Sequence, residues 1–139
     1  MLIKDPPVAI LDNLWMLGTN PYPLYLVKGE REAAVFEGGV GAMGKVLGEQ
    51  MAGLGIAGDS VKQVVVTHAH PDHVMAVPAM RALFPQAAVL ASAIAAKTLA
   101  VEKAIAAFCE MDQMLTGSLL GSGTICEEHR PEPLAAAAR

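Results

Sequence analysis

Cysteine, aromatic side chains and histidine are all scarce in this sequence. Its 139 residues include two cysteines, Cys109 and Cys126, and four histidines, while aromatic residues make up 4%. Two cysteines this far apart exclude a CxxC metal site and a disulfide framework, so we expect ordinary thiols in a reducing cytoplasm. With so few aromatic rings available, Val, Leu, Ile, Met and Ala must fill the core.

Charge is also limited, because Asp, Glu, Lys and Arg together make up 17% of the residues and the net charge is -4. No cluster of Lys and Arg is present, which argues against a nucleic-acid-binding surface. No apolar run is long enough to span a bilayer, and the first residues, MLIKDPPVAILDN, do not resemble a signal peptide. We therefore expect neither nucleic acid nor a membrane among the partners.

Apolar residues make up 53% of the chain, which favours a well-packed globule, and its length suits one domain or part of one. The order of the expected elements over residues 1–139 is that of the α/β (α+β) class. Segments rich in β-formers and separated by Gly and Pro predict an antiparallel meander, and strand–helix alternation follows it. The nearly continuous apolar character of the fourth strand predicts that both of its faces are covered. The expected strands are Ile10–Leu17, Tyr22–Val27, Glu32–Phe36, Val61–Thr67 and Ala87–Ser92; the expected helices are Met43–Leu54, Pro78–Phe84 and Ile94–Leu115; and residues 116–139 are expected to form an irregular tail.

Three of the four histidines lie in one short segment, HAHPDH, at the end of the strand expected at residues 61–67. Alternate side chains of an extended segment share a face, so His68 and His70 can reach one metal ion together. Asp72 falls on the same alternation, and His73 turns the opposite way as the chain bends. Four ligands in six residues fit two adjacent zinc-like ions with a shared hydroxide better than one ion. The alternative is that Asp72 caps a helix and the histidines are solvated.

The HAHPDH segment, preceded by VVVT, resembles the HxHxDH signature of the metallo-β-lactamase-fold hydrolases. This resemblance implies an αββα sandwich that holds one or two divalent metal ions, usually zinc and in some members iron or manganese. It further implies that His68 and His70 hold the first ion and that Asp72 and His73 hold the second. Asp72 would then be the catalytic residue that orients the attacking water. The implied reaction is hydrolysis of a small-molecule ester, thioester, lactone or phosphodiester.

The sequence departs from the family's pattern in two ways that concern the site. Glu37 stands where the family usually has an Asp before Gly, and it either supports the metal loop or is a solvated turn residue. The family also takes a third histidine, a bridging acid and a last histidine from the second half of its fold. Here only His129 follows the motif, and it is either a third ligand or an exposed loop residue.

The chain therefore resembles the N-terminal half of the fold, and half of a sandwich leaves one sheet face without a second layer. One hypothesis is a metal-dependent hydrolase that uses a metal-activated water and is incomplete in this chain. The other is a non-catalytic metal-binding or assembly half-domain that needs a partner chain. Since a large exposed apolar face marks an interface, we expect a homo-oligomer, most simply a two-fold dimer.

Overall fold

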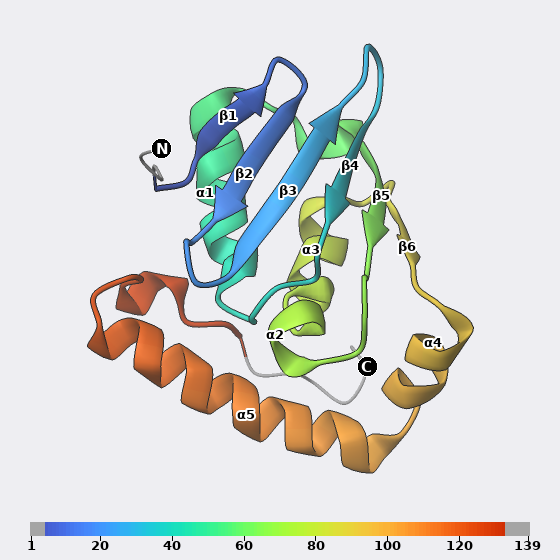
Figure 1. The fold of residues 1–139 in the computed structure, drawn as a ribbon, viewed down its shortest axis with the longest axis vertical. Coiled ribbons are helices and arrows are strands. Elements are labelled where there is room, and N and C mark those ends of the chain that lie inside the picture. Colours follow the sequence, from blue (N-terminus) through green and yellow to red (C-terminus); the bar gives the residue numbers. More distant parts are fainter. Residues whose placement is uncertain (1–4, 133–139) are drawn as a thin grey trace.

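The structure is a computed structural model that describes residues 5–132; residues 1–4 and 133–139, which include the end of the expected tail, lie outside the described part. A single six-stranded sheet runs through it, with the strands side by side in sequence order (Figure 1). The first four strands are antiparallel, and the last two continue the sheet in parallel. The strands are β1 (Val8–Leu11), β2 (Leu14–Gly18), β3 (Pro23–Lys28), β4 (Ala33–Phe36), β5 (Val61–Val65) and β6 (Ala88–Leu90).

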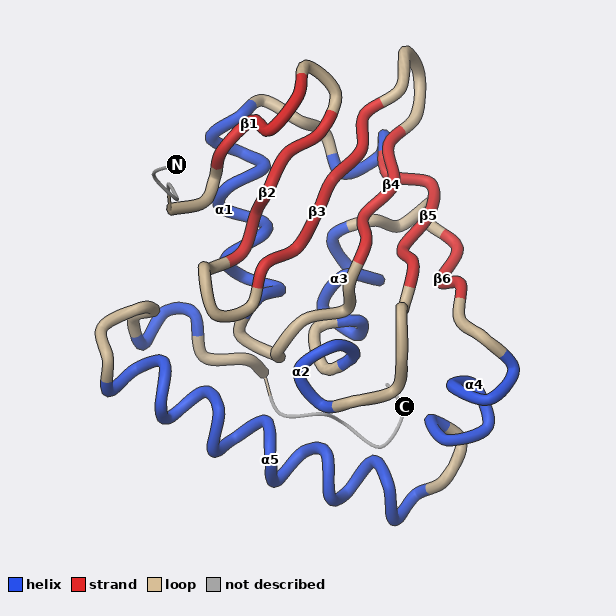
Figure 2. The backbone as a smooth tube through the Cα atoms, viewed as in Figure 1, coloured by secondary structure: helices blue, strands red, loops and turns tan. Residues whose placement is uncertain are grey.

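Two helices cover one face of the sheet, and the longest helix lies across the ends of its strands. Figures 1 and 2 show α1 and α3 behind the sheet, while the long helix α5 crosses below the lower ends of the strands, beside α2. The helices are α1 (Met43–Leu54), α2 (Pro71–Val74), α3 (Val77–Leu83), α4 (Ala93–Leu99) and α5 (Glu102–Gly121), with short 3-10 turns at Gly58–Ser60 and Glu127–His129. None of the described helices combines the length and hydrophobicity that a membrane span requires.

The core lies between the sheet and α1 with α3. The helix expected at Met43–Leu54 is confirmed, and its apolar stripe is buried against the sheet because these side chains recur at the helical period. The strands contribute alternate side chains to the same core, as their period of two requires. Fully or almost fully buried are Leu17, Leu24, Leu26, Val35 and Val64 from the strands, Met43 and Leu47 from α1, and Met80 and Phe84 from or directly after α3.

The opposite face of the sheet has no covering layer among residues 5–132. A row of paired positions, Met16, Tyr25, Phe36, Val65 and Leu90, crosses five strands on this face. Phe36 is 37% exposed and Leu90 is 43% exposed. Helices of the described chain pack against one face only, as expected for half of a sandwich, and cover for the second face stays a prediction that a partner chain must supply.

Three element boundaries also differ from the prediction. The strand expected at Ile10–Leu17 is a hairpin instead, because Asp and Asn at its centre favour a turn. The helix expected at Ile94–Leu115 is broken before α5, where Val101 has an extended backbone, and Ile94 is 79% exposed rather than part of a buried stripe. The irregular tail expected from residue 116 begins later, because α5 continues to Gly121 and buries Leu119.

Candidate metal centre

The two strands that carry the candidate site end at the same edge of the sheet. Because β4 and β5 are parallel, the residues that follow them, Glu37 and Thr67, leave the sheet on the same side. The backbone N–H of Glu37 still donates to the carbonyl of Val65, at 3.0 Å. Glu37 then turns with a φ of 91°, a left-handed conformation that costs a residue with a side chain about 1–3 kcal/mol and is most often kept at functional sites.

The segment after Glu37 is hydrogen-bonded to the helix that carries the motif. The Gly38 N–H donates to the His73 carbonyl at 2.9 Å, and the Ala76 N–H donates to the Gly38 carbonyl at 2.8 Å. A Cβ atom at position 38 would lie 2.4 Å from the His73 carbonyl oxygen, so this approach requires glycine. His70 precedes α2 in an extended conformation, and Pro71 begins the helix with a φ suited to that position.

The four motif side chains gather at this edge. The ring of His68 lies 3.9 Å from the ring of His73 and 4.8 Å from the ring of His70, centroid to centroid. Asp72 Oδ2 lies 3.3 Å from His73 Nε2. Glu37, His68 and His73 each offer one possible ligand atom, and these atoms lie within 4.8 Å of one another. The structure thus brings together every residue of the motif and Glu37.

Glu37 is not a solvated turn residue, because its side chain is 14% exposed and bonded on both oxygens. Oε2 accepts a hydrogen bond from His73 Nδ1, and Oε1 accepts one from the Thr67 hydroxyl. The Thr67 oxygen also lies 3.0 Å from His68 Nδ1. Because the Thr67 hydroxyl donates its proton to Glu37, its oxygen accepts from His68 Nδ1. Nδ1 therefore carries the proton in His68 and in His73, and Nε2 of each ring keeps a lone pair.

The resulting donor set fits a divalent cation. With a lone pair on His73 Nε2, this nitrogen and Asp72 Oδ2 are two acceptors that face each other at 3.3 Å. Two ligands at a tetrahedral angle, each about 2.0–2.1 Å from one zinc ion, are about 3.3 Å apart. His68, 3.9 Å from His73 between ring centroids, adds a further nitrogen beside them. The motif spacing alone does not indicate Thr67, and its place directly before His68 is the one sequence signal that points to it.

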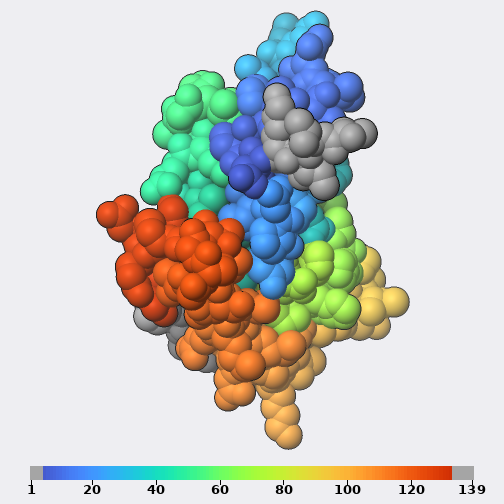
Figure 3. Space-filling view, turned by 60° about the vertical axis from the view of Figure 1, so that its left-hand side comes forward, coloured from blue at the N-terminus to red at the C-terminus, as the bar shows by residue number. Residues whose placement is uncertain are grey.

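His129 lies away from this cluster. Its Nε2 is 2.7 Å from Glu49 Oε2 on α1, and its Nδ1 accepts the backbone N–H of Cys126 at 3.2 Å. Figure 3 shows this C-terminal part, in red, against the end of the molecule where the turn after β2 meets α1. The structure therefore gives His129 a carboxylate partner and does not bring it to the motif. Cys109 and Cys126 are free thiols.

Solved structures with a similar fold are metallo-β-lactamases. A motif mutant of the enzyme from Cronobacter sakazakii superposes with a TM-score of 0.63 at 24% identity, over 67% of this chain and 36% of that chain. MEM-A1, a subclass B3 enzyme from a soil metagenome library, gives 0.61 at 23% identity, over 66% and 34%. SMB-1 in a complex with mercaptoacetic acid gives 0.58 at 28% identity, over 63% and 34%.

These likenesses cover a limited part of each relative, since the chain spans about a third of the length of the structures it matches. The family model of the metallo-beta-lactamase superfamily matches residues 18–133, most of the chain. That stretch holds β3 and β4, the glycine segment after β4 and the cluster at the end of β5. The chain belongs to the metallo-β-lactamase superfamily.

Proposed function

We propose that this chain is the metal-binding part of a metal-dependent hydrolase. The observation that carries the proposal is the pair of opposed acceptors, His73 Nε2 and Asp72 Oδ2, beside His68. The two side chains are partly exposed, at 28% and 37%, and the approach of two acceptors at this distance is unfavourable unless a cation lies between them. Membership of the superfamily supports the same conclusion independently of this geometry.

His68 and His70 are assigned to one ion, and Asp72 and His73 to a second. Zinc suits imidazole and carboxylate ligands best, and iron or manganese are alternatives. A bound ion of this kind supplies Lewis acidity and a water that ionises near neutral pH. Asp72 then acts as the catalytic residue, because its carboxylate can accept a hydrogen bond from the attacking water and fix its direction. Glu37 is a positioning residue, which acts through His73 and Thr67.

The proposed substrates are small molecules with an ester, thioester, lactone or phosphodiester bond. A second candidate function is a non-catalytic metal-binding or assembly half-domain, favoured by the uncovered sheet face and by the distance of His129 from the motif. Turnover of a generic thioester or phosphodiester by the 139-residue chain, abolished by a chelator, separates the two. We also propose a cytoplasmic location, which rests on the two free thiols.

Metal content tests the site directly. After loading with Zn²⁺ and desalting at neutral pH, the wild-type chain is expected to retain metal, measured by plasma mass spectrometry. The double variant His68→Ala with His70→Ala should lose most of it. His129→Ala removes the same ring from a position away from the cluster and should retain as much as the wild type. Unchanged metal content in the double variant would show that the site is wrongly assigned.

A further inference from the structure

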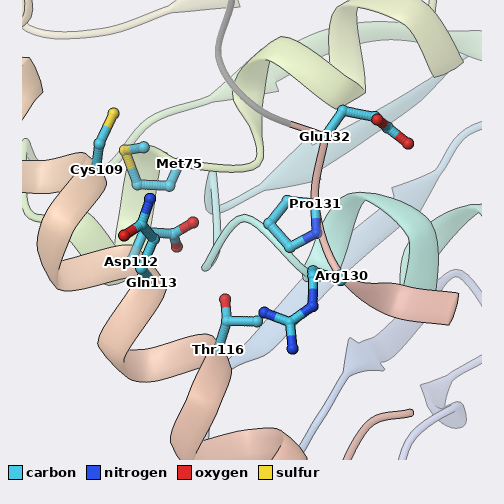
Figure 4. Close-up of a pocket in the computed structure, with 8 residues that line it drawn as sticks. All are labelled: Met75, Cys109, Asp112, Gln113, Thr116, Arg130, Pro131 and Glu132. Atoms are coloured by element: carbon cyan, nitrogen blue, oxygen red, sulfur yellow. The ribbon is translucent and has the colours of Figure 1, made fainter. Parts of the chain in front are cut away.

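A cavity of about 320 Å³ lies between α5, the turn after α2 and the segment that follows the last 3-10 turn (Figure 4). Asp112 and Thr116 line it from α5, Met75 lines it from the turn, and Arg130 and Pro131 face them. A volume at the lower end of the range for ligand sites accommodates a molecule of few heavy atoms. None of these residues belongs to the metal cluster.

Thr116 supplies a polar group that nothing in the described protein satisfies. The residue is 2% exposed, and its hydroxyl is the one buried side-chain N or O atom within residues 5–132 that has no hydrogen-bond partner. Figure 4 shows this hydroxyl directed along α5 toward Asp112. Because a buried hydroxyl without a partner is costly and rare in native proteins, its position marks a place for a ligand group.

Asp112 lies one helical turn before Thr116 on the same face of α5 and is 6% exposed. Oδ1 accepts the backbone N–H of Gly41 at 2.7 Å, while Oδ2 has no hydrogen bond within the described chain. Burial raises the pKa of this carboxyl, and the Gly41 N–H opposes that shift. The carboxylate therefore lacks the compensation that a buried negative charge needs.

No cation of the described chain contacts Asp112. Arg130 lines the same cavity, but its Nε and Nη2 both donate to Glu127, each at 3.0 Å. Glu132, also at the cavity, pairs with Lys45 at 3.1 Å. The positive charges near the cavity are thus committed to other carboxylates, and the remaining charge on its wall is negative.

We propose that this cavity binds a small organic ammonium ion that also carries a hydroxyl group, which is the chemistry of an amino alcohol. The ammonium group donates to Asp112 Oδ2, and the ligand hydroxyl shares a hydrogen bond with Thr116 Oγ1. Met75 and Pro131 contact the short carbon chain. The proposal does not rest on hydrolase activity, because it uses neither the motif residues nor a metal ion.

The probe is 2-aminoethanol, titrated into the 139-residue chain in phosphate buffer and followed by amide chemical shifts. Tris is avoided because it is itself an amino alcohol. Saturable shifts at Met75 and Thr116 are expected, with a dissociation constant in the millimolar range because so few heavy atoms make contact. Ethylene glycol has the same shape and no charge, and it should bind at least about tenfold more weakly, since hydrogen bonds to a charged group are stronger.

Asp112→Asn keeps an oxygen for the Gly41 N–H and should weaken binding about tenfold; Thr116→Val should weaken it about threefold. Glu110→Gln, exposed on the same helix, is the control and should bind as the wild type does. The double variant His68→Ala with His70→Ala should also bind normally, which separates this site from amine binding to a metal. Absence of saturable shifts, equal binding of ethylene glycol, or unweakened binding to Asp112→Asn would overturn the proposal. If Asp112→Asn fails to fold, the comparison of 2-aminoethanol with ethylene glycol on the wild-type chain still tests whether the cavity selects an ammonium group.

Discussion

At the scale of single residues, the most informative side chain is Glu37. It links the turn after β4 to the motif, since one of its oxygens accepts from Thr67, 30 positions later, and the other from His73, 36 positions later. Its backbone is in the left-handed region, and its carboxylate accepts from Thr67, which closely follows β5. Glu37 stands where the family usually has the shorter Asp. Its side chain reaches the motif because Gly38, directly after it, lets the chain approach α2 closely.

Glu37→Gln tests whether this residue positions ligands or is itself a ligand. The amide can still accept one hydrogen bond but loses the charge, so Zn²⁺ affinity, measured by competition with a coloured chelator, should fall about 10- to 100-fold. Glu32→Gln, exposed in the turn before β4, should leave affinity unchanged. Wild-type affinity in Glu37→Gln would remove its positioning role. Complete loss, equal to that of the His68→Ala and His70→Ala pair, would make Glu37 a direct ligand.

The sequence was a sufficient guide to the motif but not to its supports. His68, His70, Asp72 and His73 are close in the sequence, so their local spacing alone predicts that they share a site. Thr67 and Asp112 act through contacts that depend on how distant segments pack. The bond from Gly41 to Asp112 spans 71 positions, and no local pattern indicates which buried acid on a helix will meet which glycine.

At the scale of elements, the hydrophobic pattern predicts a helix or strand correctly where its buried side chains recur at a single period. The stripe of α1 predicted that helix because one side of it faces the sheet throughout. The helix expected at Ile94–Leu115 includes most of α5 but misses the break before it and its last turns; the buried residues Asp112 and Thr116 are polar and so add nothing to an apolar stripe. Exposed apolar side chains obscure the pattern further: Ile94 in α4, Val101 directly before α5, and Met111 and Met114 in α5.

Two glycines of α1 should respond in opposite directions to alanine. A Cβ atom on Gly44 would lie 2.4 Å from Ala79 Cβ on α3, so Gly44→Ala must push the helices apart and should destabilise the fold by about 1–3 kcal/mol. A Cβ atom on Gly53 meets nothing within 4 Å, and Gly53→Ala should stabilise it by about 0.5–1 kcal/mol through helix propensity. Urea unfolding of both variants measures the free energies. Shifts of the same sign would contradict the close packing of α1 on α3.

At the scale of the whole molecule, we expect the sheet face that residues 5–132 leave uncovered to determine how the chain associates in solution. Its six strands, spaced about 4.8 Å apart, give a face about 24 Å wide. The row through Tyr25 continues to Val8 on β1, so it is apolar across all six strands, with no charged residue among its paired positions. A surface of this extent suits a standard interface of about 800 Å² per partner. A second copy of the chain has the same apolar row, so in a two-fold dimer the row of one copy packs against the row of the other.

The 139-residue chain is therefore expected to form a two-fold dimer through this face, with light scattering after size exclusion as the measurement. Tyr25→Lys puts a charge at the middle of the row and should shift the population to monomer, because an unpaired ammonium would be buried at the interface. Met114→Lys places the same charge on α5, where the side chain is 75% exposed, and should remain dimeric. A monodisperse wild-type monomer that melts cooperatively would contradict the dimer, and so would an aggregate without defined size. A dimer that persists in Tyr25→Lys but dissociates in Met114→Lys would move the interface from the sheet to the helix.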